Sequence, residues 1–287
     1  MIDEQFTFMG PTGQRIEFGN SAPFILLSHD GVGGAPATIQ MQKSPYQDGQ
    51  TYIDTLLEIR PIALQILIKA DNQSELSTLR AKLINALNPK GGPRSLRYKV
   101  GEHEKEIFAA VEHAPVFASG GDNRGATFQV ALINFICPDP CWRDINPTNI
   151  KLEDFVANFS FPFSFPVRFA IRGDTRTLVN AGHVPTPVKI TFRGESINPK
   201  ITKIDTGEFV KINRTIPAGY SLVITTGFND KSVRIIAPDG VETNAMGYID
   251  LNSTFFALDV GDNQLSFITD GGQPDVYIEY RNLYLGV

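Results

Sequence analysis

Residues 205–207 (DTG) have the sequence of an aspartic protease motif, in which the aspartate acts in acid–base catalysis. That chemistry needs two carboxylates that share one proton, so a single motif must pair with another. Glu208 follows the motif, where a small side chain is expected. Asp and Gly are also favoured in tight turns, so we interpret the motif as a hairpin turn. No catalytic residue is predicted.

Cys137 and Cys141 could bind a metal ion or act as a nucleophile. A structural zinc site needs four ligands, usually in two close pairs. The sequence has four histidines, which form no such pair: His29, His103, His113 and His183. A nucleophilic cysteine with a histidine base stays possible, but no local signature supports it. No metal or cofactor is predicted, and two cysteines provide no disulfide framework, which indicates folding in a reducing cytoplasm.

Two glycine-containing motifs have structural interpretations. Residues 30–34 (DGVGG) have the glycines of a phosphate loop, which lies between a strand and a helix. Here residues 35–36 (AP) and a new strand follow, so a chain reversal with positive φ is predicted instead. Residues 172–174 (RGD) match an adhesion tripeptide, but this composition is also typical of turns.

Composition and charge narrow the class of protein. A length of 287 residues suggests about two domains. With 42% hydrophobic and 20% charged residues, the chain is expected to be soluble and globular. A net charge of −5 argues against strong non-specific binding of nucleic acid. Its apolar runs are shorter than the ~20 residues of a membrane-spanning helix, and its start lacks the layout of a signal peptide.

One segment has helical periodicity. Leucines at helical spacing predict a helix over residues 74–87. Asn72 and Glu75 form a capping pair at its start. Residues 88–93 (NPKGGP) end it, because they contain two prolines and two glycines.

Alternation with period two predicts strands around this helix. Residues 53–60 alternate as a half-buried strand, and residues 62–68 are apolar enough to be covered on both faces. Residues 106–111 and 128–136 add two more strands. We therefore predict an N-terminal β-domain with one helix over residues 1–145.

Residues 146–165 form a predicted connector that is rich in Phe and Pro. Such a density of Phe lowers solubility unless the rings are buried. The burial can be within the chain or against another subunit. The interface candidates in this connector are Phe159, Phe161, Phe163 and Phe165.

Residues 166–287 form a predicted second domain made of β-strands. Residues 188–192 and 276–280 alternate between apolar and polar side chains, and turn signals recur at intervals of roughly 10 to 20 residues. This pattern favours a β-sandwich of the jelly-roll kind. The fold class is therefore mainly β, with two domains.

The order of the motifs resembles the distal tail (Dit) proteins of long-tailed, siphovirus-type bacteriophages. The segments that resemble this family are residues 28–34, 44–49, 58–61, 87–89, 137–142, 180–182, 187–190, 205–208 and 260–263. The resemblance spans almost the whole chain.

This resemblance implies a structural role and no enzymatic activity. Its first domain would resemble a tail-tube subunit, and its second would be a galectin-like sandwich. Members assemble as hexameric rings that join the tail tube to the tip protein and dock receptor-binding proteins. The implied location is the tail tip of the virion, after assembly in the cytoplasm of the bacterial host. No membrane insertion is implied.

A ring of six copies would carry a charge of six times −5, or −30. An excess of negative charge on the channel wall would repel DNA phosphates, so DNA would pass through the lumen without specific binding.

Two other functions are considered. A carbohydrate-binding adhesin would stack sugars on exposed aromatic rings of the C-terminal domain. Possible glycan contacts are Tyr220, Tyr248, Tyr277 and Tyr284. A hydrolase would need a carboxylate pair, and no spacing singles one out.

Overall fold

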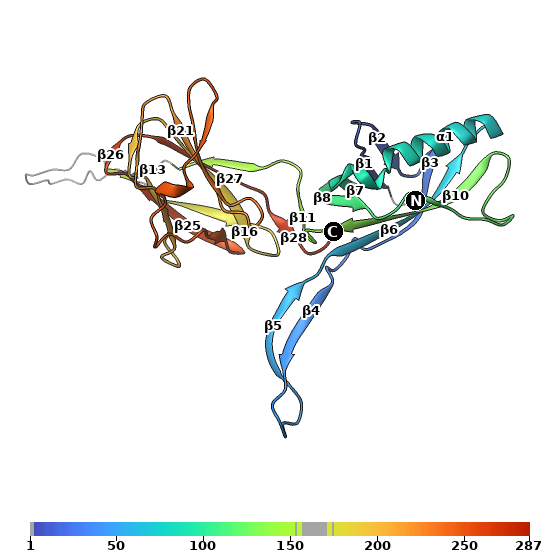
Figure 1. The fold of residues 1–287 in the computed structure, drawn as a ribbon, viewed down its shortest axis with the longest axis horizontal. Helices are drawn as coiled ribbons and strands as arrows, with labels where there is room; N and C mark the ends of the chain where they lie inside the picture. Colours follow the sequence, from blue (N-terminus) through green and yellow to red (C-terminus); the bar gives the residue numbers. More distant parts are fainter. Residues whose placement is uncertain (1–2, 153, 157–170, 174) are drawn as a thin grey trace, which may run out of the picture. The chain divides into compact units, whose positions relative to one another are not determined.

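The computed structural model describes residues 3–152, 154–156, 171–173 and 175–287 (Figure 1). The chain divides into two compact units. Unit 1 comprises Met1–Ile145 and Tyr284–Val287, and unit 2 comprises Asn146–Leu283. The described residues form many strands and one α-helix, so the predicted mainly-β fold class is confirmed. The four interface candidates of the connector, Phe159, Phe161, Phe163 and Phe165, lie outside the described residues.

Unit 1 is a curved β-structure with a helix packed on it. Its helices are α1 (Gln73–Ala86) and the 3-10 helix η1 (Pro89–Gly91). Its strands are β1 (Glu4–Met9), β2 (Arg15–Phe18), β3 (Phe24–Asp30), β4 (Ala37–Gln42), β5 (Thr51–Leu57), β6 (Arg60–Lys69), β7 (Arg94–Val100), β8 (His103–Val111), β9 (Val116–Phe117), β10 (Phe128–Cys137) and β11 (Trp142–Asp144).

The main sheet of unit 1 has the order β2-β1-β7-β8-β10-β6-β3. Strand β9 pairs with β10, and β11 pairs with β8. The two ends of this order approach each other, because Leu26 N–H donates to Gly19 C=O at 2.7 Å. The sheet therefore curves around one hydrophobic core, which contains the buried Trp142 and Phe135.

Strand β6 supplies one face of this core. Side chains alternate along a strand, and Ile62, Leu64, Ile66 and Ile68 point inward and are buried. The alternate positions are only partly covered, so the prediction that residues 62–68 are covered on both faces was wrong. The apolar Ala63 on the outward side made the segment look continuously buried in sequence.

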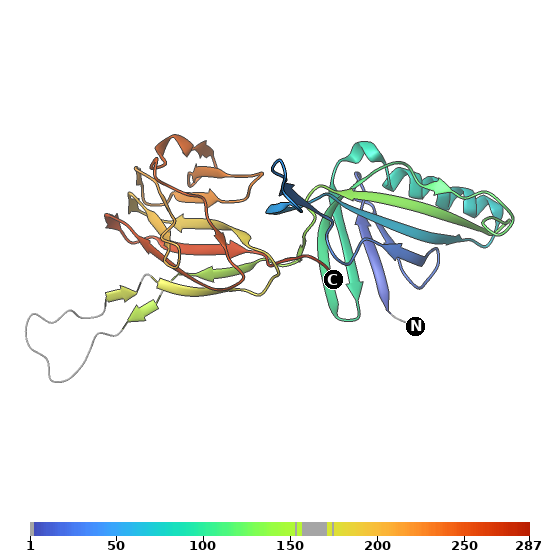
Figure 2. The same ribbon diagram turned by 90° about the horizontal axis from the view of Figure 1, so that it is seen from below.

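Helix α1 begins and ends one residue before the predicted bounds of 74–87. The side chain of Asn72 accepts a hydrogen bond from Glu75 N–H at 2.9 Å, and Glu75 accepts one from Asp71 N–H at 2.8 Å. This arrangement satisfies backbone donors at the helix start and confirms the capping pair. Leu76 and Leu83 are buried in the core of unit 1. Figure 2 shows the helix lying along the strands of this unit.

Strands β4 and β5 form a hairpin that projects from the rest of unit 1 (Figure 1). Every residue of both strands is exposed. The prediction that residues 53–60 form a half-buried strand was therefore wrong for the protomer. Period-two alternation identifies an amphipathic strand, but it does not identify what covers its apolar face.

Unit 2 is a β-sandwich. Its strands are β12 (Thr148–Lys151), β13 (Asp154–Val156), β14 (Ile171–Gly173), β15 (Thr175–Asn180), β16 (Thr186–Arg193), β17 (Ser196–Ile197), β18 (Lys200–Lys203), β19 (Phe209–Lys211), β20 (Thr215–Ile216), β21 (Ser221–Thr225), β22 (Ser232–Ile236), β23 (Glu242–Asn244), β24 (Ala257–Leu258), β25 (Gly261–Ile268), β26 (Gly271–Gly272) and β27 (Asp275–Tyr280). The 3-10 helix η2 (Met246–Tyr248) follows β23, and β28 (Leu283–Tyr284) contains the boundary with unit 1.

Two main sheets form this sandwich. One has the order β12-β27-β16-β21-β22-β23, and the other has the order β15-β25-β18-β19. Alternate residues of β16 and β27 point into a shared core that includes Ile190, Phe192 and Ile278. The predicted strands at 188–192 and 276–280 are confirmed.

Candidate functional site

The DTG segment has a structural role in unit 2. Residues 205–207 form the turn between β18 and β19, and Asp205 accepts a hydrogen bond from Gln264 N–H at 2.9 Å. Thr206 donates to the carboxylate of Glu208 at 2.8 Å. Asp205 thus has a backbone partner that fixes the turn, as expected for the turn interpretation.

The two cysteines are buried in unit 1 as free thiols. Burial raises the pKa of Cys137 to about 12 and that of Cys141 to about 11. The thiolate is the nucleophile and the metal ligand, so both groups are unreactive near neutral pH. Among the described residues, no group of three His, Cys, Asp or Glu side chains is placed to hold a metal ion.

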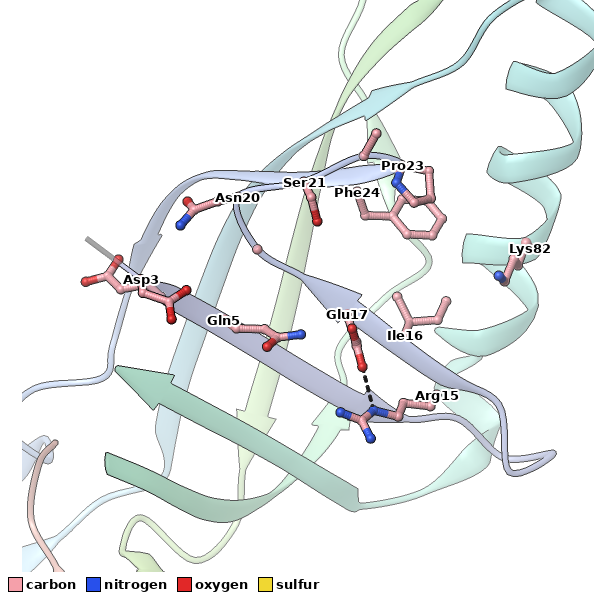
Figure 3. Close-up of a pocket in the computed structure, with 13 residues that line it drawn as sticks. Asp3, Gln5, Arg15, Ile16, Glu17, Asn20, Ser21, Pro23, Phe24 and Lys82 are labelled. Atoms are coloured by element: carbon pink, nitrogen blue, oxygen red, sulfur yellow. Dashed lines mark ion pairs between the residues drawn. The ribbon is translucent and has the colours of Figure 1, made fainter. Parts of the chain in front are cut away.

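A pocket of about 340 Å³ lies beside β1, β2 and α1 (Figure 3). Asp3 and Glu17 contribute acidic groups, and Lys82 contributes a basic group from α1. Arg15 Nε lies 2.8 Å from Glu17 Oε1, and both side chains are exposed. An exposed ion pair of this kind contributes little energy.

Residues 30–34 lie at the base of the β4–β5 hairpin. The predicted reversal with positive φ is found at Gly31, whose φ is 90°. A Cβ atom at this position would overlap the carbonyl oxygen of Pro61, so no larger residue fits without a shift of the backbone. Gly31 therefore allows both the turn and the close approach to the start of β6.

Arg60 organises this base from the interior of unit 1. Its Nε donates to Pro140 C=O at 2.7 Å, and its Nη1 donates to the carbonyls of Gly31 and Gly33, both at 2.7 Å. Its Nη2 donates to Leu285 C=O at 2.5 Å. One guanidinium therefore joins the base of the hairpin, the 137–141 segment and the C-terminal residues of the chain.

The guanidinium of Arg60 is fully buried, and this burial lowers its pKa. The guanidinium of arginine still keeps its positive charge in proteins. Its planar group has five N–H donors, which suits acceptors in several directions. Residues 284–287 reinforce the arrangement, since Val287 N–H donates to Val32 C=O at 3.3 Å. A Cβ at Gly286 would lie 2.7 Å from Gly33 O.

The hairpin held at this base exposes apolar side chains, and four of them gather on one face. Strand pairing places Ile39 opposite Thr55 and Met41 opposite Tyr52, and opposed residues share a face. Ile39, Met41, Tyr52 and Leu57 make up this surface, which we call the hairpin apolar face, and each is between 41% and 60% exposed. Exposed apolar surface of this kind marks an interaction site.

The four tyrosines considered as glycan contacts lie at separate places. Tyr220 packs against the core of unit 2, Tyr248 lies in η2, and Tyr277 lies in β27. Tyr284 belongs to unit 1. Cations lie near three of the rings: Arg214 at 4.2 Å from Tyr248, Arg193 at 4.7 Å from Tyr277 and Lys105 at 3.9 Å from Tyr284. A cation over a ring competes with a sugar for that face.

Comparisons with known proteins identify the family. Residues 12–137 match the model of a phage tail protein RIFT-related domain. Residues 181–284 match the model of a siphovirus-type tail component, C-terminal domain. The chain belongs to the siphovirus distal tail protein family. It is therefore a structural component of a phage tail.

Solved structures of this family and of phage baseplates have the same fold. The SPP1 Dit protein, described as a paradigm of hub adsorption apparatus in Gram-positive infecting phages, aligns with a TM-score of 0.71 and 14% identity, over 97% of this chain and 98% of its own. A chain of the phage P2 baseplate with Ca aligns with a TM-score of 0.57 and 10% identity, over 100% of both chains. No curated protein sequence matches significantly.

Sequence reasoning missed the role of Arg60 in this distal tail protein. Arg60 lies two residues before Ile62 and therefore has the inward parity of β6. This inward position could have revealed the role of Arg60 from sequence, because a charged side chain that points into a core needs buried partners. Its acceptors are backbone carbonyls at distant positions, which no side-chain pattern reveals.

In the part of the chain that the structure describes, no helix is long and apolar enough to cross a membrane.

Proposed function

We propose that this distal tail protein is the hub subunit of a tail tip and assembles as a hexameric ring. The ring joins the tail tube to the tip protein and gives receptor-binding proteins a surface on which to dock. It acts at the tail tip of the virion after assembly in the host cytoplasm. Its role is structural rather than catalytic, and DNA passes through its lumen without specific binding.

The hairpin apolar face is the observation that carries this proposal. A two-stranded hairpin alone is marginally stable in water, and β4 and β5 pair only with each other among the described strands. The rigid base formed around Arg60 fixes the direction of the hairpin. A second copy that covers Ile39, Met41 and Leu57 would stabilise it.

A contact between a hairpin and a different surface of the next copy is heterologous. Heterologous contacts form a closed ring when the rotation between copies closes, and an open filament when it does not. The hub role described for the SPP1 Dit protein supports a closed ring. Apolar burial and a fixed hairpin direction together favour one repeated geometry.

Light scattering of the purified chain tests the ring. Six copies of the 31.6 kDa chain have a mass of six times 31.6 kDa, or 189.6 kDa, and a double ring has twice this mass. Negative-stain images of the same sample are expected to show an open centre. A 31.6 kDa particle at every concentration would contradict the ring.

Substitution of the hairpin apolar face tests its role. We expect Ile39→Thr/Met41→Thr/Leu57→Thr to give monomers, because Thr keeps strand propensity but removes apolar area. The matched control is Val241→Thr/Val260→Thr/Ile268→Thr, which changes three exposed apolar side chains of unit 2 and should keep the ring. A hairpin variant that retains the ring mass would refute this interface.

A further inference from the structure

A second surface of unit 1 has the chemistry of a binding site. A groove of about 510 Å³ lies between α1 and the segment from β9 to β10. From α1 it is lined by Gln73, Leu76, Ser77 and Arg80, which lie three or four residues apart and share one helix face. Arg124 is the second cationic residue of the lining. We call this surface the arginine groove.

The charge of the arginine groove is opposite to that of the chain. Its lining has two arginines and no Asp or Glu, whereas the whole chain has a net charge of −5. Among the described residues, neither Arg80 nor Arg124 has a side-chain hydrogen bond or an ion pair to a carboxylate. Glu75, on the same helix, is turned to Asp71 N–H. The groove therefore offers two guanidinium groups to an external anion.

One arginine is held in position by an aromatic ring. The guanidinium of Arg80 lies 4.3 Å from the centroid of the Phe117 ring. A cation over an aromatic face is attracted to the ring, while the N–H groups at its edge remain available as donors. Less side-chain entropy is then lost when a ligand binds.

The opposite wall of the groove is held by a buried glutamine. Gln129 Nε2 has two N–H donors and lies within hydrogen-bond distance of three carbonyl oxygens, those of Ala118 at 2.8 Å, Val130 at 2.9 Å and Asn123 at 3.2 Å. A backbone hydrogen bond also holds this segment, since Asn123 N–H donates to Gly120 C=O at 3.1 Å. The segment that carries Arg124 is therefore structured without a ligand.

We propose that the arginine groove binds the carboxylates of an acidic segment of a partner protein. Guanidinium groups bind carboxylates through paired, charge-assisted hydrogen bonds. The lining adds Gln73 and Ser119, whose side chains can bond to the backbone of an extended peptide, and Ser77, whose hydroxyl donates to Gln73 C=O at 3.0 Å and can still accept. The partner surface is acidic and polar, whereas the surface that covers the hairpin apolar face in the ring is expected to be apolar. Binding of the acidic segment does not depend on ring formation.

Fluorescence anisotropy with a labelled hexaglutamate peptide tests this proposal on the full chain. We expect hexaglutamate to bind and hexaglutamine not to bind. Binding should weaken when the salt concentration rises from about 50 to about 300 mM, because screening reduces charge attraction. Equal binding of the two peptides would refute a carboxylate site.

Paired substitutions locate the binding. We expect Arg80→Gln/Arg124→Gln to weaken hexaglutamate binding at least about tenfold, because two charge-assisted contacts are lost. The control Lys189→Gln/Arg193→Gln makes the same change of net charge on unit 2 and should bind as the wild type does. Trp142 fluorescence checks that the fold is intact. Equal weakening by both variants would refute the site.

Competition distinguishes the class of partner. Short duplex DNA presents phosphates rather than carboxylates, and we expect it to displace hexaglutamate less effectively than unlabelled hexaglutamate does. Stronger displacement by DNA would overturn the assignment to an acidic protein segment. Light scattering of the groove variant separates this site from the ring. The ring mass is expected to stay unchanged while peptide binding is lost.

Discussion

Among the residues that the structure describes, unit 1 and unit 2 each bury one cationic side chain, and they satisfy it in different ways. Arg60 in unit 1 donates to four backbone carbonyls. Lys203 in unit 2 donates to Ala257 C=O at 3.0 Å and to a carboxylate oxygen of Asp259 at 2.5 Å. Lys203 is 2% exposed, but Asp259 is 60% exposed. The first cation has neutral partners inside the protein, and the second reaches a counter-ion at the surface.

The partners of each cation determine how much it contributes to the stability of its unit. The planar guanidinium of Arg60 fixes three separate segments at once, and its acceptors would be left without these donors if it were lost. Lys203 holds a single segment, β24 and the following Asp259, and water can replace it at the exposed Asp259. We therefore expect unit 1 to depend on its cation more strongly than unit 2.

Replacement of Arg60 should have the largest effect. We expect Arg60→Met to lower the free energy of unfolding of unit 1 by about 3 to 5 kcal/mol, because buried carbonyls lose their donors. Trp142 is the single tryptophan and lies in the core of unit 1, so its fluorescence follows this unit during denaturation. Arg60→Lys keeps the positive charge but loses the planar set of N–H donors. Its loss of unfolding free energy should therefore lie between those of the wild type and Arg60→Met. A loss below about 1 kcal/mol for Arg60→Met would remove the contrast with Lys203.

The thiols beside Arg60 make the free energy of unfolding of unit 1 depend on pH in the alkaline range. Burial raises the pKa of Cys137 from 9.0 to about 12 and that of Cys141 from 9.0 to about 11. The folded state therefore favours the protonated thiols. The stabilisation that the protonated thiols give to the folded state is complete below pH 9 and is lost as the pH rises through 11 and 12. We expect the unfolding free energy of unit 1 to fall by about 2 kcal/mol between pH 9 and 10.

Denaturation at several pH values, followed by Trp142 fluorescence, checks this dependence. The variant Cys137→Ala/Cys141→Ala should show a flatter profile between pH 9 and 10. Burial also raises the pKa of Tyr98, from 10.0 to about 12, so a remaining decline is expected above pH 10. An unchanged slope in the double variant would show that the thiols are not the cause.

The parts that sequence could predict are those set by local patterns. Leucine spacing and the Asn72 cap defined α1 to within one residue, and alternation located β8, β10, β16 and β27. The alternation of side chains along a strand tells which residues share a face. It does not tell whether the same chain covers that face. The exposed hairpin was misread for this reason.

The arrangement around Arg60 could not be predicted for a different reason. Its acceptors come from residues 31, 33, 140 and 285, and backbone carbonyls have no side-chain signature. The arginine groove has a similar origin, since Arg80 and Arg124 are brought together by tertiary packing of the helix against the segment after β9. Sequence patterns define elements, and these sites depend on contacts between distant elements.

Replacement of the cation of unit 2 should have a smaller effect. We expect Lys203→Met to lower the stability of unit 2 by about 1 to 2 kcal/mol, because Ala257 C=O loses its donor while the Met side chain fills the space. Segment-resolved hydrogen exchange can measure the loss near residues 257–259. The Trp142 transition should stay unchanged, since Trp142 belongs to unit 1. A destabilisation equal to that of Arg60→Met would show that buried cations matter equally whatever their partners.

Removal of the counter-ion alone should have the smallest effect. We expect Asp259→Asn to lower the stability of unit 2 by less than about 1 kcal/mol, because the exposed carboxylate of Asp259 is screened by water and the Asn oxygen still accepts from Lys203. The difference from the wild type should shrink further as salt is added, since screening weakens exposed charge pairs. Asp259→Ala removes the acceptor as well and is the matched comparison. If Asp259→Asn destabilises unit 2 as much as Lys203→Met does, and salt does not change this, then Asp259 neutralises a buried charge. Lys203 would in that case need its counter-ion, whereas Arg60 is held by carbonyls alone.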